Sequence, residues 1–327
     1  MQLTDIPVFV AAKHLIAQNQ HFWLCTILNT YGSAPRPIGS VFITDGEHRY
    51  GSISGGCLED AFVEMLNQNK FKKHNQLFTY GDHATEQGVV RELPCGGTIE
   101  LLIEYIEVNN SSTEHFLQCS NHAVNRLPFK RQMTLQSNTR ECLELKDFAV
   151  KQVEKSADTV GLNYSKVFTL LLIGIGQVTE EIARLGLQAG FEVKVCDMRK
   201  QLASSWTFDK ENGGVDIIWM SPDLFVEQYA DEQSAVLALA HDPSIDDAAL
   251  MSVFDTKAFY IGAMGSHRTT ENRIERLTRI CEIKQQQLSR LHAPIGLNIG
   301  SKTPFEIAIS TLADIIRIKN HVSKEQL

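Results

Sequence analysis

Residues 167–179 read VFTLLLIGIGQVT and define the architecture of the second half of the chain. The apolar start is typical of a strand inside a parallel sheet, and Gly174 and Gly176 follow in the spacing of a tight strand-to-helix turn. A helical pattern and a second apolar strand, which ends at Asp197, complete a βαβ unit. This order predicts a Rossmann-like fold in which the turn approaches a phosphate and Asp197 binds a ribose. Thr179 stands at the third glycine position, so the match to a dinucleotide-binding turn is incomplete.

Further strand-like runs extend this unit into a doubly wound parallel sheet. They are separated by helix-like segments and cover residues 215–220, 235–240 and 258–261. His241 follows one of these runs, and Gly262 and Gly265 follow another. Because ligands of open α/β sheets bind outside the carboxyl ends of the strands, these residues are expected to face the crevice beside the glycine turn. Taken singly, each segment is better explained as a simple turn.

A loop of small residues in the first half delivers a cysteine to a helix. The sequence GSISGGCLE (51–59) is followed by apolar residues at helical spacing, so Cys57 is expected in the first turn, where thiolate is favoured. Gly55 and Gly56 let backbone amides approach a ligand. Arg36 lies in a stiff loop rich in proline and glycine, which a hairpin connects to the cysteine loop, and Cys95 also precedes two glycines. The alternative interpretation of Cys57 is a buried, unreactive thiol in a tight turn.

Composition sets limits on the class of protein. The 327 residues are enough for two domains, and a net charge of −8 disfavours nucleic acid and anionic membranes as partners. Seven widely spaced cysteines without a C-x-x-C pair disfavour a disulfide framework or a zinc site. The apolar runs are too short for membrane insertion, and we expect a cytoplasmic protein.

We expect the two domains to cover residues 1–160 and 166–327. The first is predicted to open with a helix and a strand, as an α+β domain. Within it, the weak pattern of residues 108–160 predicts irregular or small antiparallel structure, and Asn109 to Ser112 reads as a loop.

Several motifs in order resemble one known family over nearly the whole chain. In the first half they are GSAPR (32–36), GGCLE (55–59) and CGG (95–97); in the second half they are GIG (174–176), HDP (241–243), YIGAMGS (260–266) and PIGL (294–297). Together they resemble the xanthine dehydrogenase accessory factors of the XdhC/CoxI family. The resemblance implies an N-terminal domain of the XdhC/CoxI type followed by a Rossmann-like domain.

The resemblance also implies a function. Members of that family bind the molybdenum cofactor, protect it while a sulfido ligand is installed, and pass it to apo xanthine dehydrogenase or a related molybdenum hydroxylase, with a cysteine desulfurase as the sulfur donor. On this basis Cys57 is the expected thiolate toward the metal, Cys95 is a second candidate, and Arg36 and the amides around Gly55 and Gly56 are expected to hold the phosphate. Such a protein is a maturation factor, and a homodimer is expected.

The second domain leaves several interpretations open. Its crevice, with Gly174, Gly176, Asp197, His241, Gly262 and Gly265, binds a nucleotide, the pterin of the cofactor, or a partner protein. An alternative function is an NAD(P)-dependent oxidoreductase in which Asp197 binds the adenosine half and His241 acts as acid or base. A third is a docking scaffold whose glycine loops bind no ligand.

Overall fold

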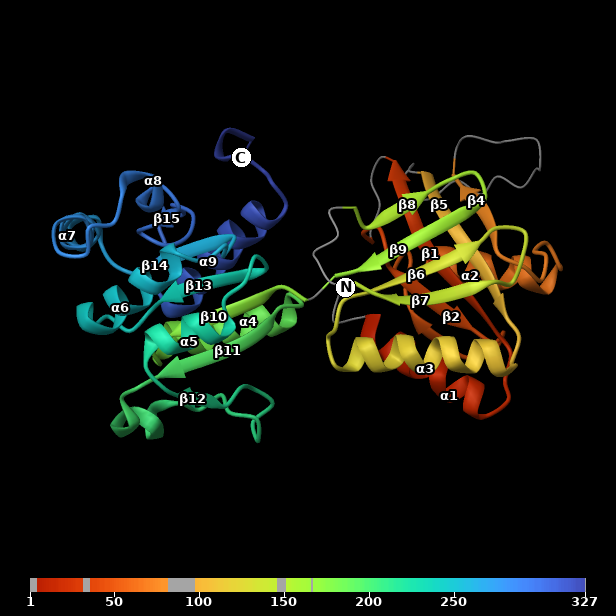
Figure 1. The fold of residues 1–327 in the computed structure, drawn as a ribbon, viewed down its shortest axis with the longest axis horizontal. Coiled ribbons are helices and arrows are strands. Elements are labelled where there is room, and N and C mark those ends of the chain that lie inside the picture. The colour runs from red at the N-terminus through yellow and green to blue at the C-terminus, as the bar shows by residue number, and fades with distance from the viewer. Residues whose placement is uncertain (1–4, 32–35, 82–97, 146–150, 166, 327) are drawn as a thin grey trace. The chain divides into compact units, whose positions relative to one another are not determined.

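The structure is a computed structural model that describes residues 5–31, 36–81, 98–145, 151–165 and 167–326. Contacts divide the chain into two compact units, Met1–Val167 and Phe168–Leu327. Figure 1 traces their helices and strands. Within the described ranges, every helix is too short or too polar to cross a bilayer.

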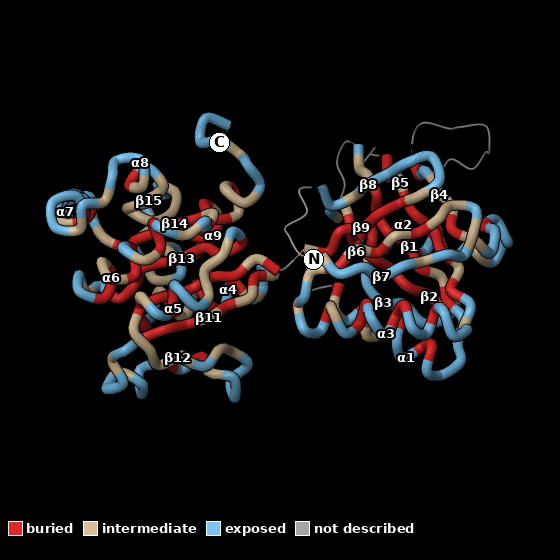
Figure 2. The backbone as a smooth tube through the Cα atoms, viewed as in Figure 1, coloured by how far each residue is buried: buried red, intermediate tan, exposed pale blue. Residues whose placement is uncertain are grey.

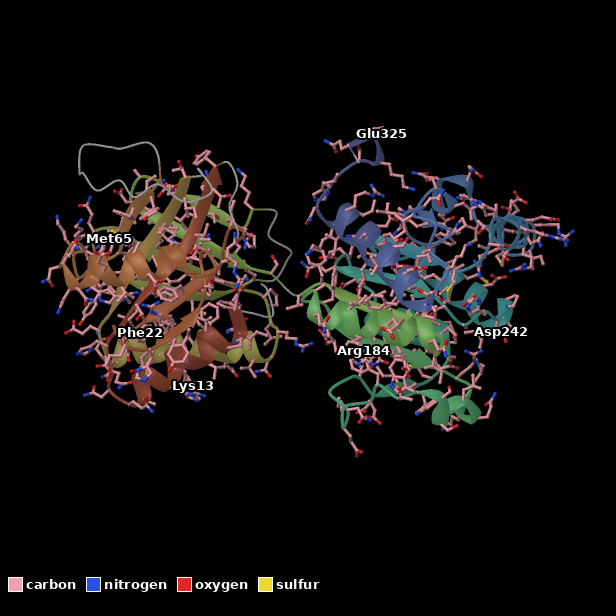
Figure 3. The ribbon with its side chains drawn as sticks, turned by 180° about the vertical axis from the view of Figure 1, so that it is seen from behind. Lys13, Phe22, Met65, Arg184, Asp242 and Glu325 are labelled. Carbon is pink, nitrogen blue, oxygen red and sulfur yellow. The ribbon has the colours of Figure 1, made fainter. Side chains whose placement is uncertain are left out.

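The first unit is built on a five-stranded antiparallel sheet. Its order is β3-β2-β1-β5-β4, and its strands are β1 (Phe22–Tyr31), β2 (Val41–Thr44), β3 (Arg49–Gly51), β4 (Gln76–Tyr80) and β5 (Thr98–Ile106). The central strand β1 is apolar on both faces because both are covered. Helix α2 (Cys57–Asn67), which carries Met65, covers one face, as the view from behind shows (Figure 3). Helix α1 (Ile6–Ala17) packs on the other face.

A second antiparallel sheet shares the core on the α1 side. Its order is β7-β6-β9-β8, with β6 (Phe129–Thr134), β7 (Arg140–Glu144), β8 (Val153–Lys155) and β9 (Thr159–Tyr164). Phe9 of α1 makes edge-to-face contacts with Phe129 and Tyr164, at centroid distances of 5.6 and 5.2 Å. Arg131 of β6 is fully buried and bonds the buried carboxylate of Glu104 at 3.0 and 3.1 Å.

The prediction for residues 108–160 was right about antiparallel strands but missed a helix. Helix α3 (Asn110–Val124) follows Asn109, whose side chain accepts a hydrogen bond from the amide of Ser112 at 2.9 Å. The segment from Asn109 to Ser112, predicted to be a loop, is therefore the capped start of a helix. Asn and Ser are weak helix formers, and the helix depends on tertiary packing of Phe116, Cys119 and Ala123, which are fully buried.

The second unit is a six-stranded parallel sheet in the order β12-β11-β10-β13-β14-β15. The strands are β10 (Thr169–Ile173), β11 (Glu192–Asp197), β12 (Ile217–Trp219), β13 (Ser234–Ala238), β14 (Tyr260–Ala263) and β15 (Leu291–His292). Numbered within the unit, this order is 3-2-1-4-5-6, which is the Rossmann order. The predicted doubly wound sheet is confirmed. Figure 2 shows its strands as mostly buried.

Helices cover both faces of this sheet, as a parallel sheet requires. One face packs against α4 (Gln177–Gln188) and α9 (Pro304–Lys319), and the other against α5 (Pro222–Tyr229) and α6 (Pro243–Phe254). Helix α7 (His267–Arg279) follows β14, the short helix α8 (Gln285–Leu288) precedes β15, and 3-10 turns cover Lys200–Ser205 and Lys324–Gln326. The sheet order reverses between β10 and β13, so their carboxyl ends define the crevice of the fold.

Candidate functional site

The loops that carry the sequence motifs of the first unit leave one end of its sheet. Thr26 of β1 pairs with Val41, the first residue of β2, and Gly51, the last of β3, pairs with Phe42. The loops after β1 and after β3 therefore lie at the same end. Arg36 is partly exposed in the first of these loops.

Cys95 lies outside the described residues, so its role as a second candidate thiolate stays a prediction. The flanking strands, however, reach the same end of the sheet, because β4 ends where β5 begins, with Tyr80 opposite Ile99. Among the described residues, no group of three or more His, Cys, Asp or Glu side chains is arranged to hold a metal ion.

Helix α2 begins at Cys57, as the sequence predicts, and Glu59 organises the loop before it. One carboxylate oxygen of Glu59 accepts hydrogen bonds from the Ser52 hydroxyl at 2.7 Å and from the amides of Ile53 and Ser54 at 2.7 and 2.9 Å. The other accepts from the Ser54 hydroxyl and from the Gly56 amide, the latter at 2.9 Å. The sequence carries a signal for this role, because a Glu at the third position of a helix is typical of a capping box.

These hydrogen bonds engage the two loop amides on which the predicted phosphate site depends. The Gly56 amide donates to Glu59 and the Gly55 amide to Ser52, so both amides expected to hold a phosphate are satisfied by the loop itself. Gly55 and Gly56 have φ values of 88° and 138°, which side-chain-bearing residues rarely adopt, so the glycines are needed for the shape of the loop.

The same hydrogen bonds stabilise the charged form of the Glu59 carboxylate. Burial on its own raises the pKa of Glu59, but the hydrogen bonds from Ser54 and Ser52 outweigh it and lower the pKa to about 2. Glu59 is therefore a carboxylate at neutral pH. It occupies the place in which a loop of this type binds an anion.

In the second unit, the two glycines of the turn differ in their surroundings. Gly174 has φ 97°, and a Cβ there lies 2.3 Å from the Cα of Ala240, so the residue permits close contact between the ends of β10 and β13. A Cβ at Gly176 meets no atom within 4 Å. Thr179, at the third glycine position, donates its hydroxyl to the carbonyl of Gly174 at 2.6 Å and closes the turn.

Asp197 ends β11 as predicted, but its carboxylate is bound within the protein. It is fully buried and accepts hydrogen bonds from the amide of Ile175 at 2.8 Å and from the guanidinium of Arg199 at 3.0 and 2.7 Å. Burial raises its pKa, but the bonds to Arg199 prevail and lower it. The predicted ribose contact therefore finds this carboxylate already occupied. The sequence signal that was missed is the basic residue two positions after the acid.

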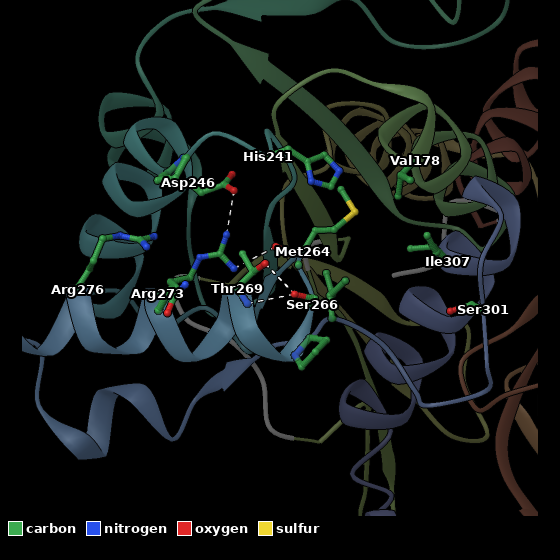
Figure 4. A pocket seen from close by; sticks show the side chains of 15 residues that line it. Val178, His241, Asp246, Met264, Ser266, Thr269, Arg273, Arg276, Ser301 and Ile307 are labelled. Atoms are coloured by element: carbon green, nitrogen blue, oxygen red, sulfur yellow. Dashed lines mark hydrogen bonds and ion pairs between the residues drawn. The ribbon is translucent and has the colours of Figure 1, made fainter.

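A cavity of this unit lies outside the carboxyl ends of β13, β14 and β15 and has a volume of about 700 Å³ (Figure 4). His241 and Gly265 line it, so the structure brings these two predicted residues together. Arg273 of α7 lies in one wall of it, with one nitrogen on Asp246 at 3.0 Å and another on the Met264 carbonyl at 3.1 Å. Arg276, also of α7, bonds Asp247 at 2.8 Å.

Gly262 does not line this cavity, which corrects the prediction for that residue. It lies within β14, and a Cβ there comes within 2.5 Å of the Ile295 side chain, so the glycine is explained by packing. His241 has φ 54° and is exposed, and it makes no hydrogen bond with the described residues.

Comparison with known proteins gives matches in both halves of the chain. The profile of the XdhC and CoxI family matches residues 15–81, and that of the XdhC Rossmann domain matches residues 170–315. A crystal structure described as a xanthine dehydrogenase from Bacillus halodurans superposes with a TM-score of 0.70 at 20% identity, covering 100% of this chain and 98% of that one. At that identity the superposition shows the fold alone.

Curated relatives span nearly the whole chain. The molybdenum cofactor insertion chaperone PaoD of Escherichia coli K12 is 23% identical over 92% of this chain and 85% of its own length. A protein of Bacillus subtilis 168 named as a probable subunit of xanthine dehydrogenase is 26% identical over 94% and 96%. The uncharacterized protein YqeB of E. coli K12 is 24% identical over 96% of this chain, which spans 46% of YqeB. With both of its domain profiles matched in order, the chain belongs to the XdhC and CoxI family.

Proposed function

We propose that this protein binds the molybdenum cofactor as cargo, protects it during sulfuration and delivers it to xanthine dehydrogenase or a related molybdenum hydroxylase. Family membership supports a role in molybdenum cofactor maturation, as does a relative named as an insertion chaperone for that cofactor. The relative whose name refers to xanthine dehydrogenase supports the class of client enzyme.

The observation that carries the proposal is the position of Cys57 as the first residue of α2, after a loop fixed by Glu59. The N-terminus of a helix stabilises a thiolate, and thiolate is a ligand that soft metal centres prefer. A pre-ordered loop lowers the entropy cost of ordering the backbone before α2 on binding.

The loop fits the thiolate role but not the phosphate role first expected of it. Since the amides of Gly55 and Gly56 are satisfied internally, a cofactor phosphate needs donors from another residue. Arg36 remains the candidate, because it lies in the loop that leaves the same end of the sheet and forms no ion pair with the described residues. An arginine binds a phosphate through paired N–H donors.

The test compares Cys57→Ala with Cys281→Ala, which removes a partly exposed thiol from the second unit. Each protein is incubated with molybdenum cofactor, and co-eluting molybdenum and pterin are measured after gel filtration. We expect stoichiometric retention by the wild type and by Cys281→Ala, and at least a tenfold loss in Cys57→Ala. Equal retention by all three proteins contradicts the proposed site, and no retention by any of them contradicts the proposed function.

The remaining steps of the proposal concern partners. A cysteine desulfurase is the proposed sulfur donor, and a homodimer is the proposed working form. Transfer is tested by adding the loaded protein to apo xanthine dehydrogenase and measuring the rise in its activity, with and without the desulfurase. Sedimentation equilibrium measures the oligomeric state.

A further inference from the structure

The cavity of the second unit lies on one side of the Rossmann crevice. Its lining comes from the segments after β13 and β14, from α7, from the loop before α9, and from Val178 at the start of α4. Asp197 and the glycine turn do not line it. In a Rossmann fold, a dinucleotide extends across both sides of the point where the strand order reverses.

Arg199 lies on the other side of the Rossmann crevice and binds the groups there. Its guanidinium binds the Asp197 carboxylate at the end of β11 and also donates to the Ala240 carbonyl beyond β13 at 3.3 Å. The ion pair therefore bridges the carboxyl ends of β11 and β13, next to the Gly174 turn between them. The Ile175 amide, which lies in the turn before α4, also donates to Asp197. The acid at the ribose position is therefore bound by a turn amide and by Arg199.

The open side offers one apolar wall and one polar wall. Val178, Met264 and Ile307 contribute apolar surface, and Figure 4 shows Val178 and Ile307 across the cavity from Arg273. The side chains of Asn272 and Ser301 line it and form no hydrogen bond with the described residues. A cavity with an apolar face and unengaged hydrogen-bonding groups suits a flat ring with a polar edge.

The charges around the cavity are balanced. Arg273 pairs with Asp246, and Arg276 pairs with Asp247, each at 3.0 Å or less. Each of these two arginines is held by an aspartate, so neither is a surplus cation for a phosphate chain. Burying a ligand charge without a counter-charge is costly, so this lining favours a neutral ligand.

We propose that the cavity binds a single neutral, planar heterocycle with a hydrogen-bonding edge, and that Arg199 excludes a dinucleotide from the crevice. Two sources supply this chemistry: a pterin and a purine nucleoside. The site is separate from the loop at Cys57 and does not depend on the function proposed for that loop.

The test uses the full-length protein and the intrinsic fluorescence of neopterin. Anisotropy gives the affinity for neopterin, and guanosine, GMP and NAD⁺ are added as competitors. We expect neopterin or guanosine to bind, GMP to bind no more tightly than guanosine, and NAD⁺ not to compete at millimolar concentration. Neopterin as the tighter ligand identifies a pterin site, and guanosine a nucleoside site.

Variants locate the binding. Asn272→Leu combined with Ser301→Ala removes two hydrogen-bonding groups and is expected to weaken binding about tenfold. Glu271→Leu, an exposed neighbour on α7 outside the cavity, is the matched control and should bind as the wild type does. Cys57→Ala should also bind normally, which separates this site from the proposed cofactor site.

Three outcomes overturn the proposal: no binding of neopterin or guanosine, competition by NAD⁺ at millimolar concentration or tighter binding of GMP than of guanosine, or wild-type affinity in the Asn272 and Ser301 double variant. The first means that the cavity takes no heterocycle. The second means that the crevice is open to phosphates, and the third places the ligand elsewhere.

Discussion

Replacing Glu59 by Gln tests whether this carboxylate holds the cysteine loop. The glutamine has nearly the same shape, but it loses the charge and turns an N–H donor toward groups that themselves donate. Ile53 is fully buried and Ser54 nearly so, so water does not readily replace the lost acceptor at their amides. We expect the loop to become less ordered and the first unit to become less stable.

The magnitude follows from the pKa of Glu59. Its value of about 2, against an ordinary 4.5, corresponds to ~3.5 kcal/mol at ~1.4 kcal/mol per pKa unit. Because Gly55 and Gly56 are exposed, solvent screens part of this interaction, and we expect a loss of about 2 kcal/mol at pH 7. A lowered pKa stabilises the fold above pH 4.5, and the contribution disappears as the pH falls toward 2. The difference between wild type and variant should therefore shrink over that range.

The assay is urea unfolding followed by the fluorescence of Trp23, which packs on Tyr105 in the first unit at 4.9 Å between ring centroids. The other two tryptophans, Trp206 and Trp219, lie in the second unit and are replaced by Phe in all proteins compared. Glu64→Gln, which removes an exposed carboxylate from the same helix, is the control and should change stability by less than about 0.5 kcal/mol. The reasoning fails if Glu59→Gln unfolds at the wild-type urea concentration at pH 7, or if their difference is as large at pH 3 as at pH 7.

Gly174→Ala should destabilise the second unit by about 3 kcal/mol, because Gly174 has a positive φ and contacts the end of β13. Gly176→Ala should change stability by less than about 0.5 kcal/mol, and thermal unfolding measures both variants. Arg131→Met leaves a buried carboxylate with one partner fewer and should cost about 3 kcal/mol in urea unfolding, against less than about 1 kcal/mol for the surface pair broken by Lys130→Met. Burial raises the pKa of Asp314, but hydrogen bonds from His292 and Arg317 outweigh it and lower the pKa to about 2. Asp314→Asn should therefore reduce the loss of second-unit stability between pH 4 and pH 2. An unchanged pH dependence of stability in the variant contradicts the assignment of this loss to Asp314.

The candidate sites could be predicted only in part from the sequence. The position of Cys57 at the start of a helix follows from local spacing, and the structure places it there. The hydrogen-bond partners of the Gly55 and Gly56 amides cannot be predicted from local spacing, because they depend on where Ser52 and the Glu59 carboxylate lie after the loop has folded. Likewise, the acid at the end of β11 was predictable, but its pairing with Arg199 depends on the conformation of the chain beyond the strand.

Local patterns were sufficient to predict the parallel sheet and the glycine turn of the second unit, because a buried strand, a tight turn and an amphipathic helix each leave a periodic signal. Helix α3 left little pattern, since its polar residues become helical only when Phe116, Cys119 and Ala123 pack against distant strands. Tertiary contacts also determine which polar groups remain available for a ligand. A side chain is free or occupied according to neighbours that are remote in sequence, and those contacts exist only in the folded chain.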